Sequence, residues 1–161
     1  MIVVADTSVI LNLCRVQQER LLQQLFKRVL IPAQVADEFA RLSKAQQRFS
    51  GLALPDWIEV LRAPKVFPSE VIQAHLDLGE SAAIALCLEQ KANALLIDES
   101  LGREVAARLG VRTIGILGIL VEARRRQFIP DVKTILQSLE TEAGFWLAPG
   151  LRDRVLTLVN E

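Results

Sequence analysis

Short runs of aliphatic residues alternate along the chain with segments in which apolar residues recur every three to four positions. Runs of the first kind predict buried strands; they cover residues 2–5, 29–31, 94–97 and 111–114. A further run at 57–61 predicts a strand at the edge of the sheet. Segments of the second kind predict helices, which cover residues 8–16, 18–27, 34–42, 69–76, 80–90, 102–109, 117–126, 132–139 and 151–159.

Proline, glycine and polar residues mark the boundaries between these elements. Pro32 ends the second strand, and Gly79 is expected to break the chain before the helix at 80–90. That helix is apolar on nearly every side, so we expect it to be buried. Ser69 is the expected N-cap of the short helix that it begins. The polar stretch 43–50 is expected to be an exposed connection.

The order of the elements predicts the fold class. Strands that alternate with helices favour a parallel sheet covered on both faces. We therefore predict an α/β fold, a three-layer α/β/α sandwich around a central, mostly parallel sheet of about four to five strands. A chain of 161 residues has the length of one domain, and no repeat or linker interrupts it. Residues 1–161 are expected to form a single domain.

Composition narrows the class of protein. The 19 basic and 19 acidic side chains cancel, so net charge predicts neither a nucleic-acid binder nor a membrane-surface protein. Cys14 and Cys87 lie far apart in apolar segments and are expected to be reduced core thiols. We expect a cytoplasmic protein, because no signal peptide is recognisable and no run approaches the ~18 apolar residues of a membrane helix.

Acidic residues stand where the predicted strands end. Asp6 directly follows the strand at 2–5, and Asp98 directly follows the strand at 94–97. Glu80 opens the buried helix, and Glu38 lies on the helix after the second strand. In parallel sheets, ligands gather beyond the carboxyl ends of the strands. The four carboxylates are therefore expected to converge there from four distant segments.

Each of these acids also has a purely structural interpretation. Asp6 is a candidate N-cap, Glu80 suits the positive end of a helix dipole, and Glu38 suits a solvent-facing helix surface. The pair Asp98 and Glu99 suits a cap for the following helix, with Arg103 as an ion-pair partner four residues after Glu99.

The combination favours a metal site. Ionised carboxylates that meet at the edge of an apolar core are costly unless a cation neutralises them, and residues 65–100 contain two lysines against six acids. Oxygen-only ligands favour Mg²⁺ or Mn²⁺. The single histidine, His75, is expected on a solvated helix face. Asp98 is expected to point into the metal pocket, whereas Glu99 is either a further ligand or only a cap.

Four motifs together resemble a known family. They are 5-ADTSVI-10, 35-VADEF-39, 79-GESAAIAL-86 and 96-LIDESLGREVA-106. In this order they resemble the PIN-domain ribonucleases, especially the bacterial and archaeal branch related to VapC-type toxins, and the resemblance spans nearly the whole chain. It implies a PIN-like nuclease domain that hydrolyses RNA phosphodiester bonds with Mg²⁺ or Mn²⁺. It also suggests that the protein is the toxin of a toxin–antitoxin pair, with an antitoxin as partner, and that it forms a homodimer.

The resemblance also implies roles for individual residues. Its catalytic acids are Asp6, Glu38, Glu80 and Asp98; its metal ligands are Asp6, Glu80, Asp98 and Glu99; its substrate contacts are Thr7, Ser8 and Arg103. Two features depart from the family pattern. Glu80 stands where many PIN domains have Asp, and Leu96-Ile97 stands where many have Thr-Asn before the last acid.

Other interpretations remain at this point. Six arginines between residues 101 and 130 are candidates for RNA backbone contacts, or form a solvated helix end. A PIN fold that acts mainly through partner or RNA binding, with little catalysis, is the alternative function. A phosphatase of the haloacid-dehalogenase type is disfavoured, because 6-DTS-8 lacks the second acid of its DxD motif. A receiver domain is disfavoured because the last strand is followed by no lysine.

Overall fold

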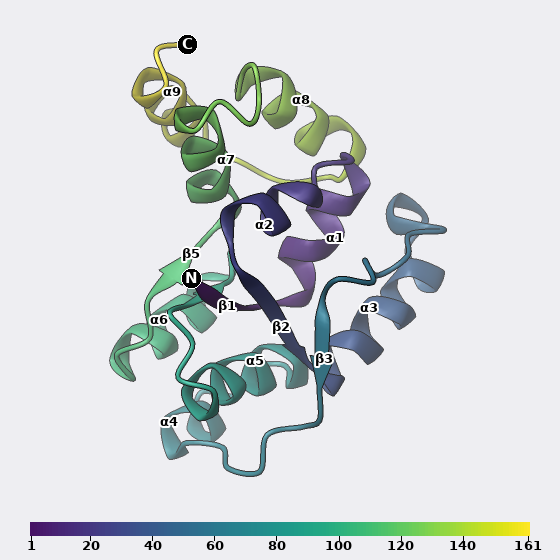
Figure 1. The fold of residues 1–161 in the computed structure, drawn as a ribbon, viewed down its shortest axis with the longest axis vertical. Helices are drawn as coiled ribbons and strands as arrows, with labels where there is room; N and C mark the ends of the chain where they lie inside the picture. The colour runs from purple at the N-terminus through teal and green to yellow at the C-terminus, as the bar shows by residue number, and fades with distance from the viewer.

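The protein is built around one sheet of five strands, all parallel, as the computed structural model of residues 1–161 shows (Figure 1). The order across the sheet is β3-β2-β1-β4-β5. The strands are β1 (Ile2–Ala5), β2 (Arg28–Pro32), β3 (Glu59–Leu61), β4 (Ala94–Leu96) and β5 (Thr113–Ile114). The predicted α/β/α architecture with a parallel sheet is therefore confirmed, and the run at 57–61 does supply an edge strand.

Helices surround this sheet. They are α1 (Thr7–Arg15), α2 (Arg20–Leu25), α3 (Ala33–Ala45), α4 (Ser69–Gln73), α5 (Leu78–Glu89), α6 (Ser100–Arg108), α7 (Ile116–Arg125), α8 (Lys133–Glu142) and α9 (Pro149–Leu158), with a short 3₁₀ turn η1 (Gln47–Phe49) after α3. In Figure 1, α4 and α5 lie at the lower end of the view and α7, α8 and α9 at the upper end, with α6 on the left and α3 on the right. None of the helices is both long enough and apolar enough to cross a membrane.

The two central strands carry the core. Val3 and Val4 of β1 and Leu95 and Leu96 of β4 have no exposed surface, which is why these segments contain unbroken aliphatic residues rather than an alternating pattern. The Asp6 amide donates a hydrogen bond to the Leu96 carbonyl oxygen at 2.9 Å, one residue beyond the end of β1. The carboxyl ends of the two strands are thus held side by side.

Helix α5 is the buried helix that the sequence predicts. It packs against β1, β2 and α3, and its residues from Gly79 to Cys87 are all buried. Its start differs from the prediction, because the helix begins at Leu78 and Asp77 is its N-cap. Gly79 therefore lies inside the first turn instead of breaking the chain before it.

Two further expectations are wrong. Residues 43–50 are not simply an exposed connection: α3 continues to Ala45, and Phe49 of the 3₁₀ turn is buried, with the Arg48 guanidinium 4.7 Å from its ring centroid. The burial of one aromatic ring by tertiary contacts overrides the polar character of the segment. Ser69 is not the N-cap of α4, since Pro68 holds that position and Ser69 is the first helical residue.

Candidate metal-binding and catalytic site

Asp6 lies between β1 and α1 and is almost completely buried, with 4% of its surface exposed. It occupies the N-cap position of α1, as the structural interpretation suggested, but its side chain makes no capping hydrogen bond. Its Oδ1 is buried without any hydrogen-bond partner. The N-cap position therefore accounts for where Asp6 lies, but it does not account for a buried carboxylate oxygen that has no hydrogen-bond partner.

Asp98 shows the same feature two residues beyond β4. Its Oδ1 accepts a hydrogen bond from the Ile116 amide at 3.1 Å, whereas its Oδ2 is buried without a partner. Gly115 makes this arrangement possible: a Cβ at that position would lie 2.6 Å from Asp98 Oδ1 and 2.9 Å from Arg103 Nη1. The backbone at the start of α7 thus approaches Asp98 more closely than a side chain there would allow.

Glu80 lies in the first turn of α5 and is also buried, with 8% of its surface exposed. Its amide donates to Asp77 Oδ1 at 2.8 Å, so the helix cap and the site share one turn. Burial raises the pKa of Glu80, and the charges of Asp77, Asp6 and Glu99 raise it further. The acid at the start of α5 is thus held among other acids.

Asp77 is the acid that the sequence analysis did not assign. Its charge raises the pKa values of Asp6, Glu38 and Glu80, so it lies within electrostatic reach of all three. A signal for it was present, because 77-DLGE-80 has the spacing of a capping box, with an N-cap acid three residues before a glutamate. That motif indicates a helix start, and only the fold shows that this start faces the site.

Glu38 reaches the same region from α3. A Cβ on Gly79 would lie 2.6 Å from Glu38 Oε2 and 3.5 Å from the hydroxyl oxygen of Thr7, so these side chains meet over the first turn of α5. Burial raises the pKa of Glu38, and the charge of Asp77 adds to the rise. The neighbouring Asp37 is exposed. The register of α3 therefore turns Glu38, and not Asp37, toward the other acids.

Asp6 stands at the centre of the acidic group. The pKa of Asp6 is raised to about 7, chiefly by burial, while the neighbouring Thr7 amide lowers it. The charges of Asp77, Glu38 and Asp98 all raise it further. Since these acids come from four different segments, the fold does bring the predicted carboxylates within electrostatic range of Asp6.

Arg103 and Glu99 do not form the ion pair that their spacing predicted. Glu99 is the N-cap of α6, and its Oε2 accepts from the Gly102 amide at 2.6 Å. The Arg103 guanidinium instead donates a hydrogen bond from Nη1 to the Ile97 carbonyl oxygen at 3.1 Å. Burial raises the pKa of Asp98, and the positive charge of Arg103 lowers it. Arg103 thus sits beside Asp98 as a local positive charge. Ser8 is half-buried in the first turn of α1.

The chemistry of these side chains fits a hard divalent cation. No group of three or more acidic, histidine or cysteine side chains is placed so that it could hold a metal ion in this structure. Two buried carboxylate oxygens, Asp6 Oδ1 and Asp98 Oδ2, nevertheless lack partners at adjacent strand ends. All the candidate metal ligands are oxygen atoms, and Mg²⁺ typically binds to a few carboxylates while it keeps several water molecules. Asp6 and Asp98 are therefore the side chains suited to hold Mg²⁺ or Mn²⁺, with Glu80 beside them.

Comparison with known proteins identifies the family of the chain. A family model described as a PIN domain, DUF3368, matches residues 2–161. No curated protein matches the chain. The chain belongs to the PIN-domain family, and PIN domains are in general nucleases.

Replacing Gly115 by alanine should disturb the site at Asp98. The added Cβ would occupy the space of Asp98 Oδ1 and Arg103 Nη1, so the carboxylate must turn away. We expect Mn²⁺ affinity, measured by the metal-induced rise in melting temperature, to fall about tenfold or more, as when a ligand loses its support. Gly150→Ala is the matched control, since nothing lies within 4 Å of a Cβ there. Equal Mn²⁺ responses in the two variants would contradict this placement of Asp98.

The raised pKa values predict how stability depends on pH. The folded pKa of Asp6, about 7, lies above its unfolded value. Between these two pKa values the folded state binds more protons than the unfolded state. The free energy of unfolding therefore decreases as pH rises, and this contribution of Asp6 to stability is lost as pH rises through about 7. The raised pKa values of Glu38, Glu80 and Asp98 act in the same direction.

We expect urea unfolding in the presence of a chelator to show lower stability at about pH 8 than at about pH 5. Asp6→Asn should flatten this dependence and stabilise the metal-free protein at the higher pH by a few kcal/mol, since one pKa unit is worth about 1.4 kcal/mol. The exposed neighbour Asp37→Asn should leave the slope unchanged. A stability that increases over this pH range would show that the acids are ionised and neutralised in the folded protein.

Proposed function

We propose that this protein is a metal-dependent endoribonuclease that hydrolyses RNA phosphodiester bonds with Mg²⁺ or Mn²⁺. The observation that carries the proposal is the pair of buried, unpartnered oxygens, Asp6 Oδ1 and Asp98 Oδ2, at the ends of adjacent strands. A folded protein rarely leaves such groups without partners unless they serve a ligand. The PIN-domain family supports a nuclease in general, and the donor chemistry supports a divalent cation.

Each acid has a proposed task. Asp6 and Asp98 hold the cation, which when bound supplies an activated water and stabilises the charge that develops on the phosphate oxygens. Glu80 takes up the proton that the attacking water loses, because it is a buried carboxylate in the first turn of α5, within electrostatic reach of Asp6. Glu38 from α3 and Thr7 from α1, whose side chains meet over the first turn of α5, orient the substrate. Glu99 acts mainly as the cap of α6.

Arg103 is proposed to assist from the other side of Asp98. Arg103 is half-buried, its one hydrogen bond in the structure goes to the Ile97 carbonyl oxygen, and its positive charge lies close enough to Asp98 to lower the pKa of that carboxyl. A cation placed next to the site favours the approach of a phosphate. A narrower hypothesis makes the protein the toxin of a toxin–antitoxin pair, with an antitoxin and a second copy of the chain as partners; it is supported only by the motif resemblance.

Cleavage assays test the proposal. The native protein should cut a panel of structured and single-stranded RNAs with Mn²⁺ or Mg²⁺, and the activity should disappear in a chelator. We expect Asp6→Asn and Asp98→Asn each to reduce the rate about 100-fold or more, because each removes a charged ligand of the cation. Glu38→Gln should reduce it, while Asp37→Asn should not.

The controls separate catalysis from folding. All variants should keep the native circular dichroism spectrum, since the asparagines match the replaced side chains in shape. Cleavage that persists in both Asp→Asn variants would refute the site. RNA binding that is intact in a native protein without any cleavage would favour the alternative function, a PIN fold that acts through binding.

A further inference from the structure

A few polar side-chain atoms are buried in this structure without a hydrogen-bond partner. They are Asp6 Oδ1, Thr7 Oγ1, Glu19 Oε2, Gln34 Oε1, Asp98 Oδ2 and Arg124 Nε. Folded proteins leave few such atoms, so each one calls for an explanation. Their places in the fold divide them into two groups.

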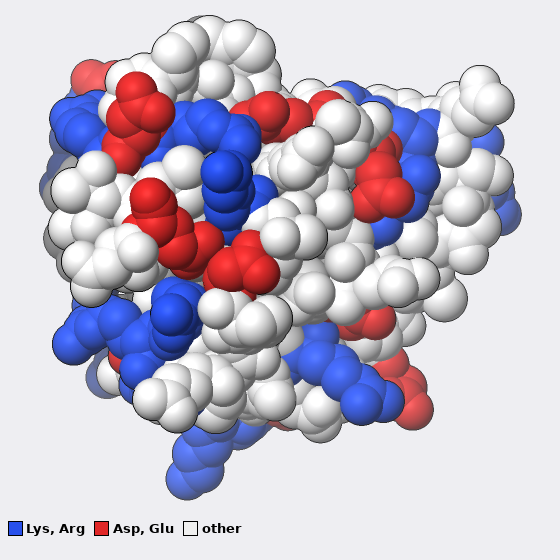
Figure 2. Space-filling model, turned by 90° about the horizontal axis from the view of Figure 1, so that it is seen from above, with Lys and Arg blue, Asp and Glu red and all other residues white.

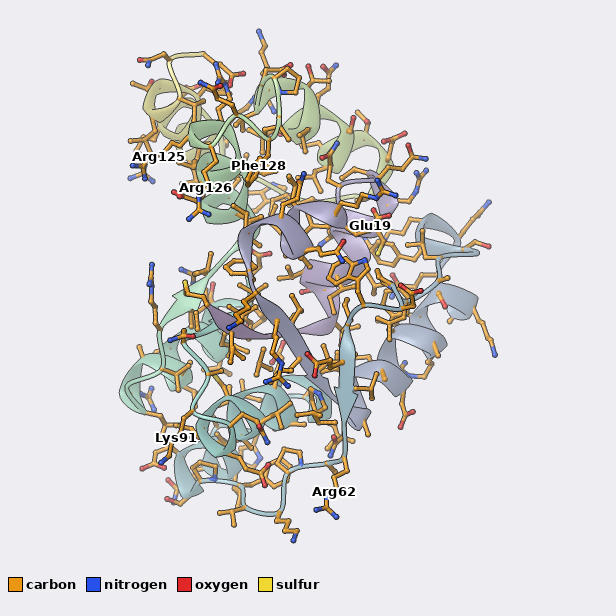
Figure 3. All side chains as sticks on the ribbon, in the orientation of Figure 1. Glu19, Arg62, Lys91, Arg125, Arg126 and Phe128 are labelled. Carbon is orange, nitrogen blue, oxygen red and sulfur yellow. The ribbon has the colours of Figure 1, made fainter.

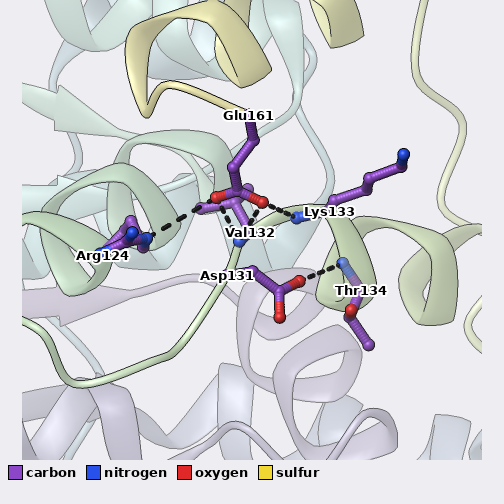
Figure 4. Close-up of polar contacts among 6 residues, drawn as sticks. All are labelled: Arg124, Asp131, Val132, Lys133, Thr134 and Glu161. Atoms are coloured by element: carbon purple, nitrogen blue, oxygen red, sulfur yellow. Dashed lines mark hydrogen bonds and ion pairs between the residues drawn. The ribbon is translucent and has the colours of Figure 1, made fainter.

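Glu19 and Arg124 lie away from the carboxyl ends of the strands. Glu19 stands between the end of α1 and the start of α2 (Figure 3), whereas the acidic site is built at the start of α1. Arg124 lies in the last turn of α7, and its Nε is 3.7 Å from Glu161 Oε2 (Figure 4). The Glu161 carboxylate also accepts hydrogen bonds from the Val132 and Lys133 amides, so it holds α7 and α8 together. Neither Glu19 nor Arg124 belongs to the site.

The other four atoms belong to residues that follow three neighbouring strands. Asp6 and Thr7 come directly after β1. Gln34 comes two residues after β2, and Asp98 comes two residues after β4. Strand β1 pairs in parallel with β2 on one side and with β4 on the other, and paired strands lie about 4.8 Å apart. Gln34 therefore stands on one side of Asp6, as Asp98 stands on the other.

Helix α3 directs Gln34 toward the same region as Glu38. Residues four apart lie one turn from each other on one face of a helix, with their Cβ atoms about 5–6 Å apart. Glu38 meets the Thr7 hydroxyl over Gly79 of α5. Gln34 is half-buried one turn nearer the start of α3, and so nearer the carboxyl end of β2. It is therefore a residue of the site that the sequence analysis did not assign.

Gln34 Oε1 needs a donor that the other residues of the site do not supply. The oxygens of Asp6 and Asp98 are the proposed ligands of the cation, and the Thr7 hydroxyl lies beside Glu38 and lowers the pKa of that carboxyl. An amide oxygen is a neutral acceptor that pairs with an N–H or O–H group, whereas ionised carboxylates only accept. The donor is therefore expected from a bound molecule.

Each sugar in a strand of RNA carries such a donor next to a phosphate. The 2′-hydroxyl donates and accepts hydrogen bonds, and through it a protein distinguishes RNA from DNA at a given position. Charge does not make this distinction, because the two strands have the same phosphates. Figure 2 shows, moreover, that Lys and Arg side chains on the face seen from above are interleaved with Asp and Glu side chains. Selection of RNA over DNA therefore depends on a contact to the sugar.

We propose that Gln34 Oε1 accepts a hydrogen bond from the 2′-hydroxyl of the nucleotide at the cleaved phosphate, and that this contact selects RNA over DNA. The inference rests on the proposed ribonuclease function, and it adds the residue that recognises the sugar. A neutral amide suits this task, since it accepts from a hydroxyl without repelling the adjacent phosphate as the surrounding acids do. Gln34 contributes to binding and specificity, and takes no part in proton transfer.

Equilibrium binding in Ca²⁺, a cation that also takes oxygen ligands, tests the contact. Two fluorescent oligouridylates of equal length are titrated with the native protein. One has ribose, and the other has 2′-fluoro sugars, which keep the sugar pucker of RNA but cannot donate. We expect the ribose strand to bind about fivefold more tightly, the value of one net hydrogen bond between neutral groups. In Gln34→Leu this ratio should fall to about one, through weaker binding of the ribose strand alone.

Gln137→Leu is the matched control, because Gln137 is an exposed glutamine on α8. It should keep the native ratio. Gln34→Leu should not lower the melting temperature, because it removes a buried acceptor that has no partner in the free protein. A Gln34→Leu variant that keeps the native ratio, or that weakens the binding of both strands equally, would overturn the proposal.

Cleavage of the ribose strand with Mn²⁺ is measured separately. RNA that is cut by a protein without any preference for ribose would leave the ribonuclease function standing and refute the role of Gln34. A ribose preference that depends on Gln34, in a protein that cuts no RNA, would refute the ribonuclease function and leave the recognition of the sugar.

Discussion

The hydrogen bond from the Asp6 amide to the Leu96 carbonyl oxygen joins the ends of β1 and β4, and the whole site depends on that parallel pairing. Because both strands end at the same edge of the sheet, the residues that follow them enter the same small volume. Asp6 comes directly after β1, and Asp98 comes two residues after β4. The buried apolar strands thus do more than form a core: they place two carboxylates where water cannot solvate them fully.

Burial of those carboxylates lowers stability, and the protein accommodates it locally. Gly79 lets Glu38 approach the first turn of α5, and Gly115 lets the start of α7 approach Asp98. The amides of Thr7 and Ile116 stabilise the charged forms of Asp6 and Asp98 only in part, because burial still raises both pKa values. A divalent cation would relieve the remaining cost. Such a locally unfavourable arrangement is typical of functional sites.

Much of the fold follows from the sequence, because its strands are apolar enough to be recognised one by one. In β1, Val3, Val4 and Ala5 are buried as predicted and Ile2 is half-buried; the acid after the strand needs only the rule that strand ends meet in a parallel sheet. Residues whose roles depend on distant segments escaped prediction. Phe49 is buried only because α3 and its neighbours surround it, and Asp77 acts on Asp6 only because α5 starts beside β1.

Side-chain direction was the other information that the sequence lacked. Spacing suggested that Glu99 pairs with Arg103, yet Glu99 turns to the helix amide and Arg103 turns to a carbonyl oxygen. Spacing also treats Arg125 and Arg126 alike, although only Arg126 lines the pocket of about 710 Å³ between β5 and α7. Adjacent residues on a helix point in directions about 100° apart, so their roles are decided by what lies around the helix.

The central claim is that Asp6 and Asp98 hold a catalytic cation together. The most direct measurement is the anomalous scattering of Mn²⁺ in crystals grown with the ion. The account predicts one peak within coordination distance, about 2.0–2.3 Å, of both Asp6 Oδ1 and Asp98 Oδ2. Mn²⁺ bound elsewhere, or no peak beside these two oxygens at saturating Mn²⁺, would contradict it.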